Sequence, residues 1–88
     1  GNVAMIVTEH GREICQLIDQ CCMRGSTILK AEGGYQGDEK QVVLVAGSNK
    51  DIHMIGKAVK EADPASFTIV MESKEVLGEG FHVTRIAE

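Results

Sequence analysis

The chain has few aromatic residues, one proline and little basic charge, and each shortage excludes a class of protein. Only 3% of its 88 residues are aromatic, and nothing in the composition indicates a linker or a low-complexity tract. Its formal net charge of −4 argues against binding a nucleic-acid polymer, because contacts with a phosphate backbone depend on clustered Lys and Arg. No apolar run approaches the roughly 18 residues that a membrane span needs, and no signal peptide is visible.

Cysteine is also scarce, and it is unevenly placed. The three cysteines are Cys15, Cys21 and Cys22. Secreted mini-domains usually carry even sets that are spread along the chain, so this pattern favours a reducing compartment. On a helix, Cys15 and Cys22 share one face, whereas Cys21 and Cys22 point about 100° apart. We interpret all three as small buried apolar residues.

Recognisable catalytic machinery is missing. No serine or cysteine stands in a nucleophile elbow with a base nearby, and the acidic residues are scattered over helix faces and loops. His10, His53 and His82 lie in separate segments without partners at helical spacing. We therefore expect neither an enzyme nor a metal site, and no residue pattern identifies a cofactor.

Four segments have the patterns of β-strands. The unbroken apolar runs at 3–7 and 41–47 predict strands buried on both faces. The alternating stretch 26–32 predicts a half-buried or edge strand. Residues 67–72 predict a fourth strand, and 81–86 a last extended segment.

Two helices are predicted between these strands. Apolar residues recur at helical spacing between 9 and 25, with Thr8 placed to cap the helix and Gly25 placed to end it. In the second helix Ser48 is a good N-cap and Asp51 lies three residues further on. That helix ends before Pro64, which cannot continue it.

The order β-α-β-β-α-β predicts one ferredoxin-like domain over residues 1–88, an α+β fold in which two helices cover one face of an antiparallel sheet. Its inner strands are the first and the third, which are also the two strands predicted to be buried on both faces. The face without helices should then be apolar, and such a patch rarely stays exposed on a soluble monomer. The chain's own tail or another copy should cover it. We favour another copy, in a dimer or trimer. Val3, Met5 and Val7 lie on one side of the first strand and Ala4 and Ile6 on the other, and the third strand leaves a similar apolar surplus, either Val42 and Leu44 or Val43 and Val45.

The segment KAEGGYQGDEKQ, at 30–41, places three glycines where the second and third strands meet. Gly33, Gly34 and Gly37 permit positive φ, and successive N–H groups there are able to form an anion-binding nest. Tyr35 adds a flat amphipathic surface and Lys40 a positive charge. A plain hairpin tip is the alternative interpretation.

These segments carry a resemblance. GSTILKAEGGYQGDEKQVVL, followed by DPASF and EVLGEGF, resembles the cytosolic C-terminal domain of YitT-type bacterial multi-pass membrane proteins, a domain of unknown function. The resemblance covers nearly the whole chain, although Ala31 stands where the family usually has glycine and Gln36 where it usually has Thr or Ser. It implies a fragment of a longer membrane protein, on the cytoplasmic side of the bacterial inner membrane. The family's topology is similar to that of PII-like signalling proteins, which are trimers that hold nucleotides between subunits.

The resemblance and the loop together lead us to expect a regulatory domain that senses a small anionic metabolite, with a nucleotide among the candidates. The expected ligand contacts come from Thr27, from the loop residues Gly33, Gly34, Tyr35 and Gly37, from Lys40, and from Gly78 and Gly80 in the second glycine cluster. One alternative is an assembly module without a ligand, in which the glycines only shape a contact between proteins. Another is an amino-acid sensor of the same topology, with its ligand near the first strand–helix loop at 8–11.

Overall fold

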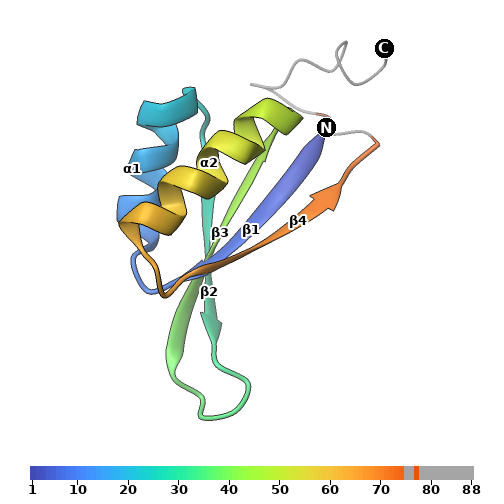
Figure 1. The fold of residues 1–88 in the computed structure, drawn as a ribbon. Coiled ribbons are helices and arrows are strands. Elements are labelled where there is room, and N and C mark those ends of the chain that lie inside the picture. The colour runs from blue at the N-terminus through green and yellow to red at the C-terminus, as the bar shows by residue number, and fades with distance from the viewer. Residues whose placement is uncertain (75–76, 78–88) are drawn as a thin grey trace.

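The computed structural model describes residues 1–74 and residue 77. Its elements are β1 (Asn2–Thr8), α1 (Gly11–Cys22), β2 (Thr27–Glu32), β3 (Glu39–Gly47), α2 (Asn49–Ala62) and β4 (Phe67–Glu72). The strands form one antiparallel sheet in the order β2-β3-β1-β4, and both helices lie against the same face (Figure 1). The predicted ferredoxin-like fold is confirmed, including the inner positions of the first and third strands. The extended segment predicted at 81–86 lies outside the described residues.

The hydrophobic core lies between the sheet and the two helices. Every second residue of β1 and β3 points into it, because successive side chains of a strand face opposite sides. Burying a side chain of this size contributes about 1.5–3 kcal/mol. The core consists of Ala4, Ile6, Val43 and Val45 from the sheet and of Ile14, Ile18, Ile52, Ile55 and Val59 from the helices.

The start of α2 agrees with the prediction. Ser48 is the N-cap, and its hydroxyl accepts a hydrogen bond from the Asp51 N–H at 3.1 Å. The Asp51 carboxylate accepts one from the Ser48 N–H at 3.4 Å. These reciprocal bonds form a capping box, which satisfies two N–H groups that would otherwise have no partner in the helix.

Both ends of α1 correct the prediction. His10 is its N-cap, whereas Thr8 lies two residues earlier, at the end of β1. The Thr8 hydroxyl accepts a hydrogen bond from the His10 N–H at 2.9 Å and donates to the buried Asp63 carboxylate at 2.6 Å. The helix ends at Cys22, before Gly25, and Met23 takes the left-handed conformation with φ of 56°. The helix therefore ends at a non-glycine residue, for which this conformation is sterically unfavourable. The residue spacing alone did not indicate this end.

The sheet face without helices is apolar on the first and third strands, as predicted, and the second and fourth strands extend it. Directly paired residues of antiparallel strands point to the same side, so the register assigns three residues of each strand to the body of this face, and Lys40, opposite Ala31, lies on the same side at the ribbon end. We call it the open face: Val3, Met5 and Val7 of β1; Thr27, Leu29 and Ala31 of β2; Val42, Leu44 and Ala46 of β3; Phe67, Ile69 and Met71 of β4. Of these twelve residues only Thr27 is polar. The third strand thus presents Val42 and Leu44 outwards and buries the alternative pair.

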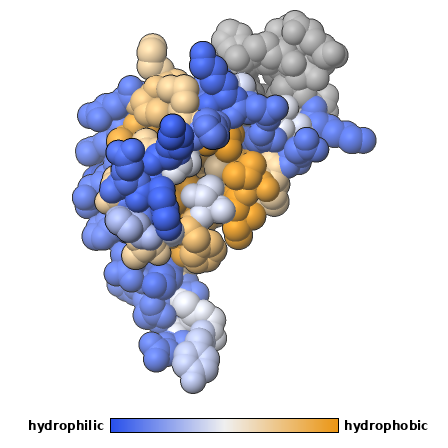
Figure 2. Space-filling model, in the orientation of Figure 1, coloured by the Kyte–Doolittle hydropathy of each residue, from blue (hydrophilic) through white to orange (hydrophobic). Residues whose placement is uncertain are grey.

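Large apolar side chains remain exposed along the edge of this sheet. On the open face, Phe67 is 57% exposed and Ile69 is 46% exposed. On the opposite side of the same strand, Val70 is 52% exposed, and Figure 2 shows hydrophobic surface over β4. A contiguous apolar patch on a protein surface usually marks a contact with another molecule.

Candidate functional site

The β2 and β3 strands continue beyond the rest of the sheet as a two-stranded ribbon, which projects from the body of the domain (Figure 1). The pairing of β1 with β3 stops at Thr8 opposite Gln41, whereas the pairing of β2 with β3 continues for two more pairs, to Glu32 opposite Glu39. The loop at 33–38 closes the ribbon. Its projecting end is hydrophilic (Figure 2), and Tyr35 is 96% exposed there.

The glycines of this loop have different structural roles. Gly37 has a φ of 75°, a conformation that side-chain-bearing residues rarely adopt. A Cβ at Gly33 would overlap the Asp38 carboxylate, while one at Gly34 would meet nothing within 4 Å. The Gly33 N–H donates to the Asp38 carbonyl oxygen at 2.6 Å, and the Gly37 N–H donates to the Gly33 carbonyl oxygen at 2.9 Å. Two of the amides expected to meet an anion therefore already donate within the loop.

The other predicted ligand residues are spread over a wider region. Ala31 lies opposite Lys40 at the base of the ribbon. Thr27 is four residues from Ala31, which is about 13 Å along the strand. Thr27 and Lys40 of one chain therefore do not meet around one small ligand. Gly78 and Gly80 lie outside the described residues.

Lys40 forms the centre of a charged cluster at the base of the ribbon. Its Nζ lies 3.1 Å from Glu9 Oε2 and 3.1 Å from Asp38 Oδ2. The hydrogen bonds to Glu9 and to Asp38 raise the pKa of Lys40 above its ordinary value, and the bond from Lys40 lowers the pKa of Asp38. Lys40 has three N–H donors and two of them are used here, so an anionic ligand would either take the third or replace one of the two carboxylates.

Three open hollows surround the same corner, and all of them border Glu9. One, of about 180 Å³, lies between Lys40 and the open-face residues Val7 and Phe67. A second, of about 430 Å³, borders Lys30 and Lys40. The third, of about 340 Å³, lies beside the start of α1 and is lined in part by His10, Arg12 and Lys30. We call the residues shared among these hollows, Glu9, His10, Lys30, Lys40 and Gln41, the ribbon base.

The sequence did not reveal most of the ribbon base. Asp38 lies two residues before Lys40, so the alternation of a strand places both side chains on one face and was a usable signal. Glu9 is 31 residues from Lys40, and only the register of β1 against β3 brings the two together. The same register explains Gly11, whose N–H donates to Gln41 Oε1 at 2.6 Å, an approach that a Cβ would obstruct.

Two kinds of feature are absent from the part of the chain that the structure describes. No group of three or more His, Cys, Asp or Glu side chains within 1–74 and 77 is placed to hold a metal ion. No helix among those same residues has both the length and the apolarity that crossing a bilayer requires.

Comparison with known sequences places the chain in a family. The sequence profile of a family described as uncharacterized protein conserved in bacteria, DUF2179, matches residues 24–78. The chain belongs to this family. It is 30% identical over 76 residues to the UPF0750 membrane protein YxkD, and 31% identical over 75 residues to the UPF0750 membrane protein YitT, both of Bacillus subtilis strain 168. These matches cover 86% and 85% of this chain but only 27% of each relative, so the chain spans about a quarter of their length. The predicted resemblance to the YitT family is confirmed.

Solved structures support the same assignment. The crystal structure of a DUF2179 protein from Eubacterium ventriosum is similar with a TM-score of 0.62 at 25% identity, over 81% of this chain and 99% of that one. A protein of Thermus thermophilus, described as a candidate PII-like signaling protein, is similar with a TM-score of 0.63 at 18% identity, over 80% of this chain and 82% of that one. The second likeness is one of fold alone.

Proposed function

We propose that this DUF2179 domain is a non-catalytic regulatory domain. In this proposal it assembles with other copies through its open face and binds a small anionic ligand, with a nucleotide among the candidates, at the ribbon base. The proposal rests on one observation above all: the open face is apolar on all four strands and ends, at Val7 and Phe67, in a hollow bordered by Lys40.

The apolar character of the open face supports assembly. Removing apolar surface from water is worth about 25 cal/mol per Å², and the edge residues Leu29, Phe67, Ile69 and Met71 are each between 44% and 57% exposed. When one face of a sheet remains in water, the inner strands normally alternate between apolar and polar residues, with the polar residues on that face. Here Met5 and Leu44, paired across the centre of the sheet, are both apolar. A second copy of the same face would cover both edges and centre.

The charges of the ribbon base support an anionic ligand. Lys30 borders two of the hollows and forms no ion pair with any other residue that the structure describes. Lys40 is held by Glu9 and Asp38, and a phosphate or carboxylate of the ligand would take the third N–H donor of Lys40 or the place of one of them. Release of the Asp38 carboxylate in particular would alter the ribbon, because the Asp38 backbone carbonyl also accepts a hydrogen bond from the Gly33 N–H.

The position of the hollow at the margin of the open face gives the remaining predicted residues a role. In an assembly through this face, the ribbon of one copy extends beyond its own sheet towards a neighbour. Tyr35 and the amide of Gly34 would then contact a ligand held between the two copies. Thr27 lies on the open face at the other end of β2 and contributes to the contact between copies. The relatives are membrane proteins, and we assign the domain to their cytoplasmic side, where ligand binding would bias the transmembrane part.

Sedimentation of two β4 variants tests the assembly. Ile69→Lys places a charge on the open face, whereas Val70→Lys places the same charge at a similarly exposed position on the other side of the strand. We expect the wild type to sediment as a dimer or trimer at high micromolar concentration, Ile69→Lys as a monomer, and Val70→Lys like the wild type. A wild-type species of 9.5 kDa at that concentration would contradict the proposal.

A thermal-shift panel of nucleotides, inorganic phosphate and amino acids, with and without Mg²⁺, tests the ligand. A ligand at 100 times its Kd adds about 2.7 kcal/mol of stability, which raises the Tm of a domain this small by more than about 10 °C. We expect this shift from a phosphate-bearing compound, and we expect Lys40→Gln to reduce it while Glu61→Gln, an exposed change on α2, leaves it intact.

Two alternatives have distinct outcomes. If no compound raises the Tm while Ile69→Lys still separates the copies, the domain is an assembly module without a ligand. The second alternative is an amino-acid sensor. It is compatible with the three hollows that border Glu9, since they lie around the loop at 8–11. That alternative requires a shift with amino acids, lost in Glu9→Gln.

A further inference from the structure

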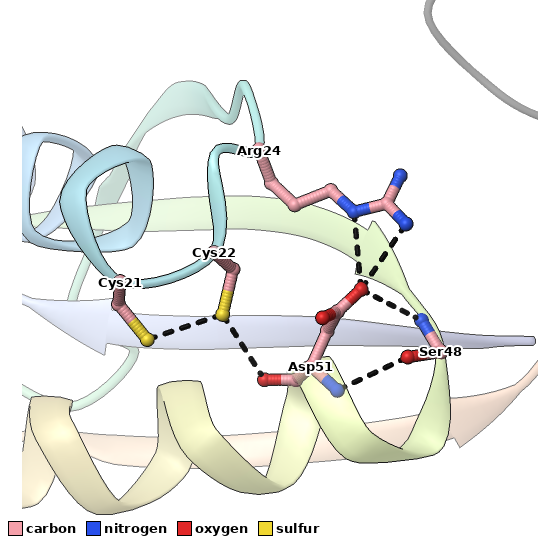
Figure 3. A network of polar contacts seen from close by, with 5 residues as sticks. All are labelled: Cys21, Cys22, Arg24, Ser48 and Asp51. Atoms are coloured by element: carbon pink, nitrogen blue, oxygen red, sulfur yellow. Dashed lines mark hydrogen bonds and ion pairs between the residues drawn. The ribbon is translucent and has the colours of Figure 1, made fainter.

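The C-terminal end of α1 brings two adjacent thiols together. Cys21 and Cys22 are the last residues of the helix, and their Sγ atoms are 3.1 Å apart (Figure 3). Consecutive side chains of a regular helix diverge by about 100°, so an ideal helix would not bring these two sulfurs together. The side chains converge in the last turn, directly before Met23 leaves the helix in the left-handed conformation.

The two thiols are also linked to α2. The Cys22 thiol donates to the backbone carbonyl oxygen of Asp51 at 3.8 Å, so its sulfur is left to accept a hydrogen bond from Cys21. Burial, the neighbouring Cys21 thiol and the nearby Asp51 raise the pKa of Cys22 to about 11. Cys22 therefore remains a neutral thiol near pH 7, and both side chains are partly exposed.

The distance between the sulfurs restricts what can join them. A disulfide needs an S–S distance of about 2.05 Å. Between adjacent cysteines it also closes a small ring that contains a single peptide bond. Its formation starts from a thiolate. A tetrahedral zinc ion bonds sulfur at about 2.3 Å, which separates two ligands by about 3.8 Å, and it requires four ligands. Within 1–74 and 77, no group of three metal-ligating side chains exists. Trivalent arsenic needs only two thiols and one further substituent, and its narrow pyramidal angles hold the sulfurs closer than zinc does.

We propose that Cys21 and Cys22 form a dithiol site for one trivalent, sulfur-seeking metalloid centre, of the class of arsenite and its monosubstituted organic derivatives. The reaction of a monosubstituted oxide, R–As=O, forms two As–S bonds and breaks two S–H bonds and the As–O double bond. The two protons leave with the oxygen as one molecule of water. No oxidation state changes, so no oxidant or reductant is needed.

Occupation of this site would act on the junction between the two helices. Bridging removes the proton that Cys22 donates to the Asp51 carbonyl oxygen. Asp51 also holds the start of α2 through Ser48 and binds Arg24, whose guanidinium nitrogen lies 3.1 Å from its carboxylate (Figure 3). The dithiol site and the ribbon base lie at opposite ends of α1, about 16 Å apart along the helix. This proposal therefore does not depend on the anionic ligand.

Phenylarsine oxide is a suitable probe for the intact chain. We expect native mass spectrometry to show one adduct per chain with loss of one water, and a thiol titration to fall from three free thiols to one. Cys15→Ser, a change on the same helix, should keep the adduct, while Cys21→Ser and Cys22→Ser should each lose it. Circular dichroism of each variant establishes that it is folded. No adduct with the folded wild type, or loss of the adduct in Cys15→Ser, would overturn the assignment.

A second measurement tests whether the fold itself preorganises the two thiols, or whether any pair of adjacent cysteines would bind equally well. The unfolded chain also carries adjacent cysteines, so the Kd of phenylarsine oxide is measured with folded and urea-unfolded wild type by competition with a small dithiol. Because the fold already holds the sulfurs 3.1 Å apart, we expect the folded chain to bind about tenfold tighter. Equal or weaker binding by the folded chain contradicts the proposal, and this comparison needs no variant.

Discussion

The two faces of the sheet are made from the same kinds of residue and yet have opposite surroundings. Under the helices, Ala4, Ile6 and Val43 are completely buried. On the open face, Met5 and Val7 alternate with them along β1 and are only partly buried, and Ile69 on β4 is nearly half exposed. Strands of a sheet with one wet face usually alternate between apolar and polar residues. The comparison shows that the chain's own helices cover one of two apolar faces, and the proposed assembly would cover the other.

The ribbon sharpens the contrast. Where β2 and β3 leave the body of the domain, their apolar residues give way to Lys30, Glu32, Glu39 and Lys40. The open face therefore ends at a charged corner, and the part of the ribbon beyond it is hydrophilic (Figure 2). An apolar contact surface bordered by charges is the arrangement expected of an interface core and its rim.

The largest effect is expected from truncating the covered face. Ile6→Ala should lower the free energy of unfolding by about 2–5 kcal/mol, because it leaves a cavity in the core. Met5→Ala, one residue away on the open face, should cost less than about 1 kcal/mol in dilute solution. Its cost should grow with protein concentration, because assembly stabilises only the folded chain. Urea unfolding at low and high micromolar protein gives both numbers.

Equal losses from these two variants in dilute solution would break the comparison. That result would mean that the open face is covered within a single chain. A Met5→Ala cost that does not change with protein concentration would argue against assembly through this face.

A smaller effect is expected at the start of α2, which belongs to the covering layer. Burial acts to raise the pKa of Asp51, but the hydrogen bonds from Ser48 and the guanidinium of Arg24 outweigh it, and the pKa lies below its ordinary value of 3.8. The carboxylate therefore contributes stability above pH 3.8, and that contribution is lost as the pH falls through the lower, folded-state pKa. Asp51→Asn should cost about 1 kcal/mol at pH 7.

Thermal unfolding between pH 2 and pH 7 measures this contribution. The wild type and Asp51→Asn should differ at neutral pH and converge at the acid end of the range. Glu61→Gln, which alters an exposed carboxylate of the same helix, serves as the matched control and should follow the wild type throughout. A difference between wild type and Asp51→Asn that stays constant with pH would show that the cap acts without its charge.

Much of the fold was predictable because its signals are local. The alternation in 26–32, the unbroken runs at 3–7 and 41–47, and the Ser48–Asp51 cap each depend on neighbours in sequence. The structure confirms the cap and the three strands, although only one face of the inner strands is fully buried in the single chain. The ends of α1 were not predictable in this way. The Thr8 hydroxyl donates to Asp63, 55 residues away, and no local pattern indicates that contact.

The candidate site was less predictable for the same reason. Glycine content pointed to the loop, and the structure gives Gly33 and Gly37 roles inside the loop itself. The charged partners of Lys40 and the hollows around Glu9 depend on how β1 pairs with β3. The contact between Cys21 and Cys22 depends on how the last turn of α1 closes, which an ideal helix does not predict.

The smallest effect is expected at the tip of the ribbon, which neither face of the sheet covers. Gly34→Val should change stability by less than about 0.5 kcal/mol, because the position is open and exposed. Gly37→Val should cost more than about 1 kcal/mol, because its φ of 75° is strained for a residue with a side chain.

This pair of glycines separates folding from recognition. Gly34→Val leaves the loop conformation intact, so any loss of affinity for a compound found in the thermal-shift panel reports contact at the tip. We expect that loss to be several-fold, measured by titration calorimetry, with Gln36→Ala, a change at an exposed neighbour, as the control. Unchanged affinity in Gly34→Val would confine the ligand to the ribbon base, where Lys40 alone of the predicted loop residues would remain in contact. The tip would then act only between copies, and the charged corner of the open face would be the whole of the binding site.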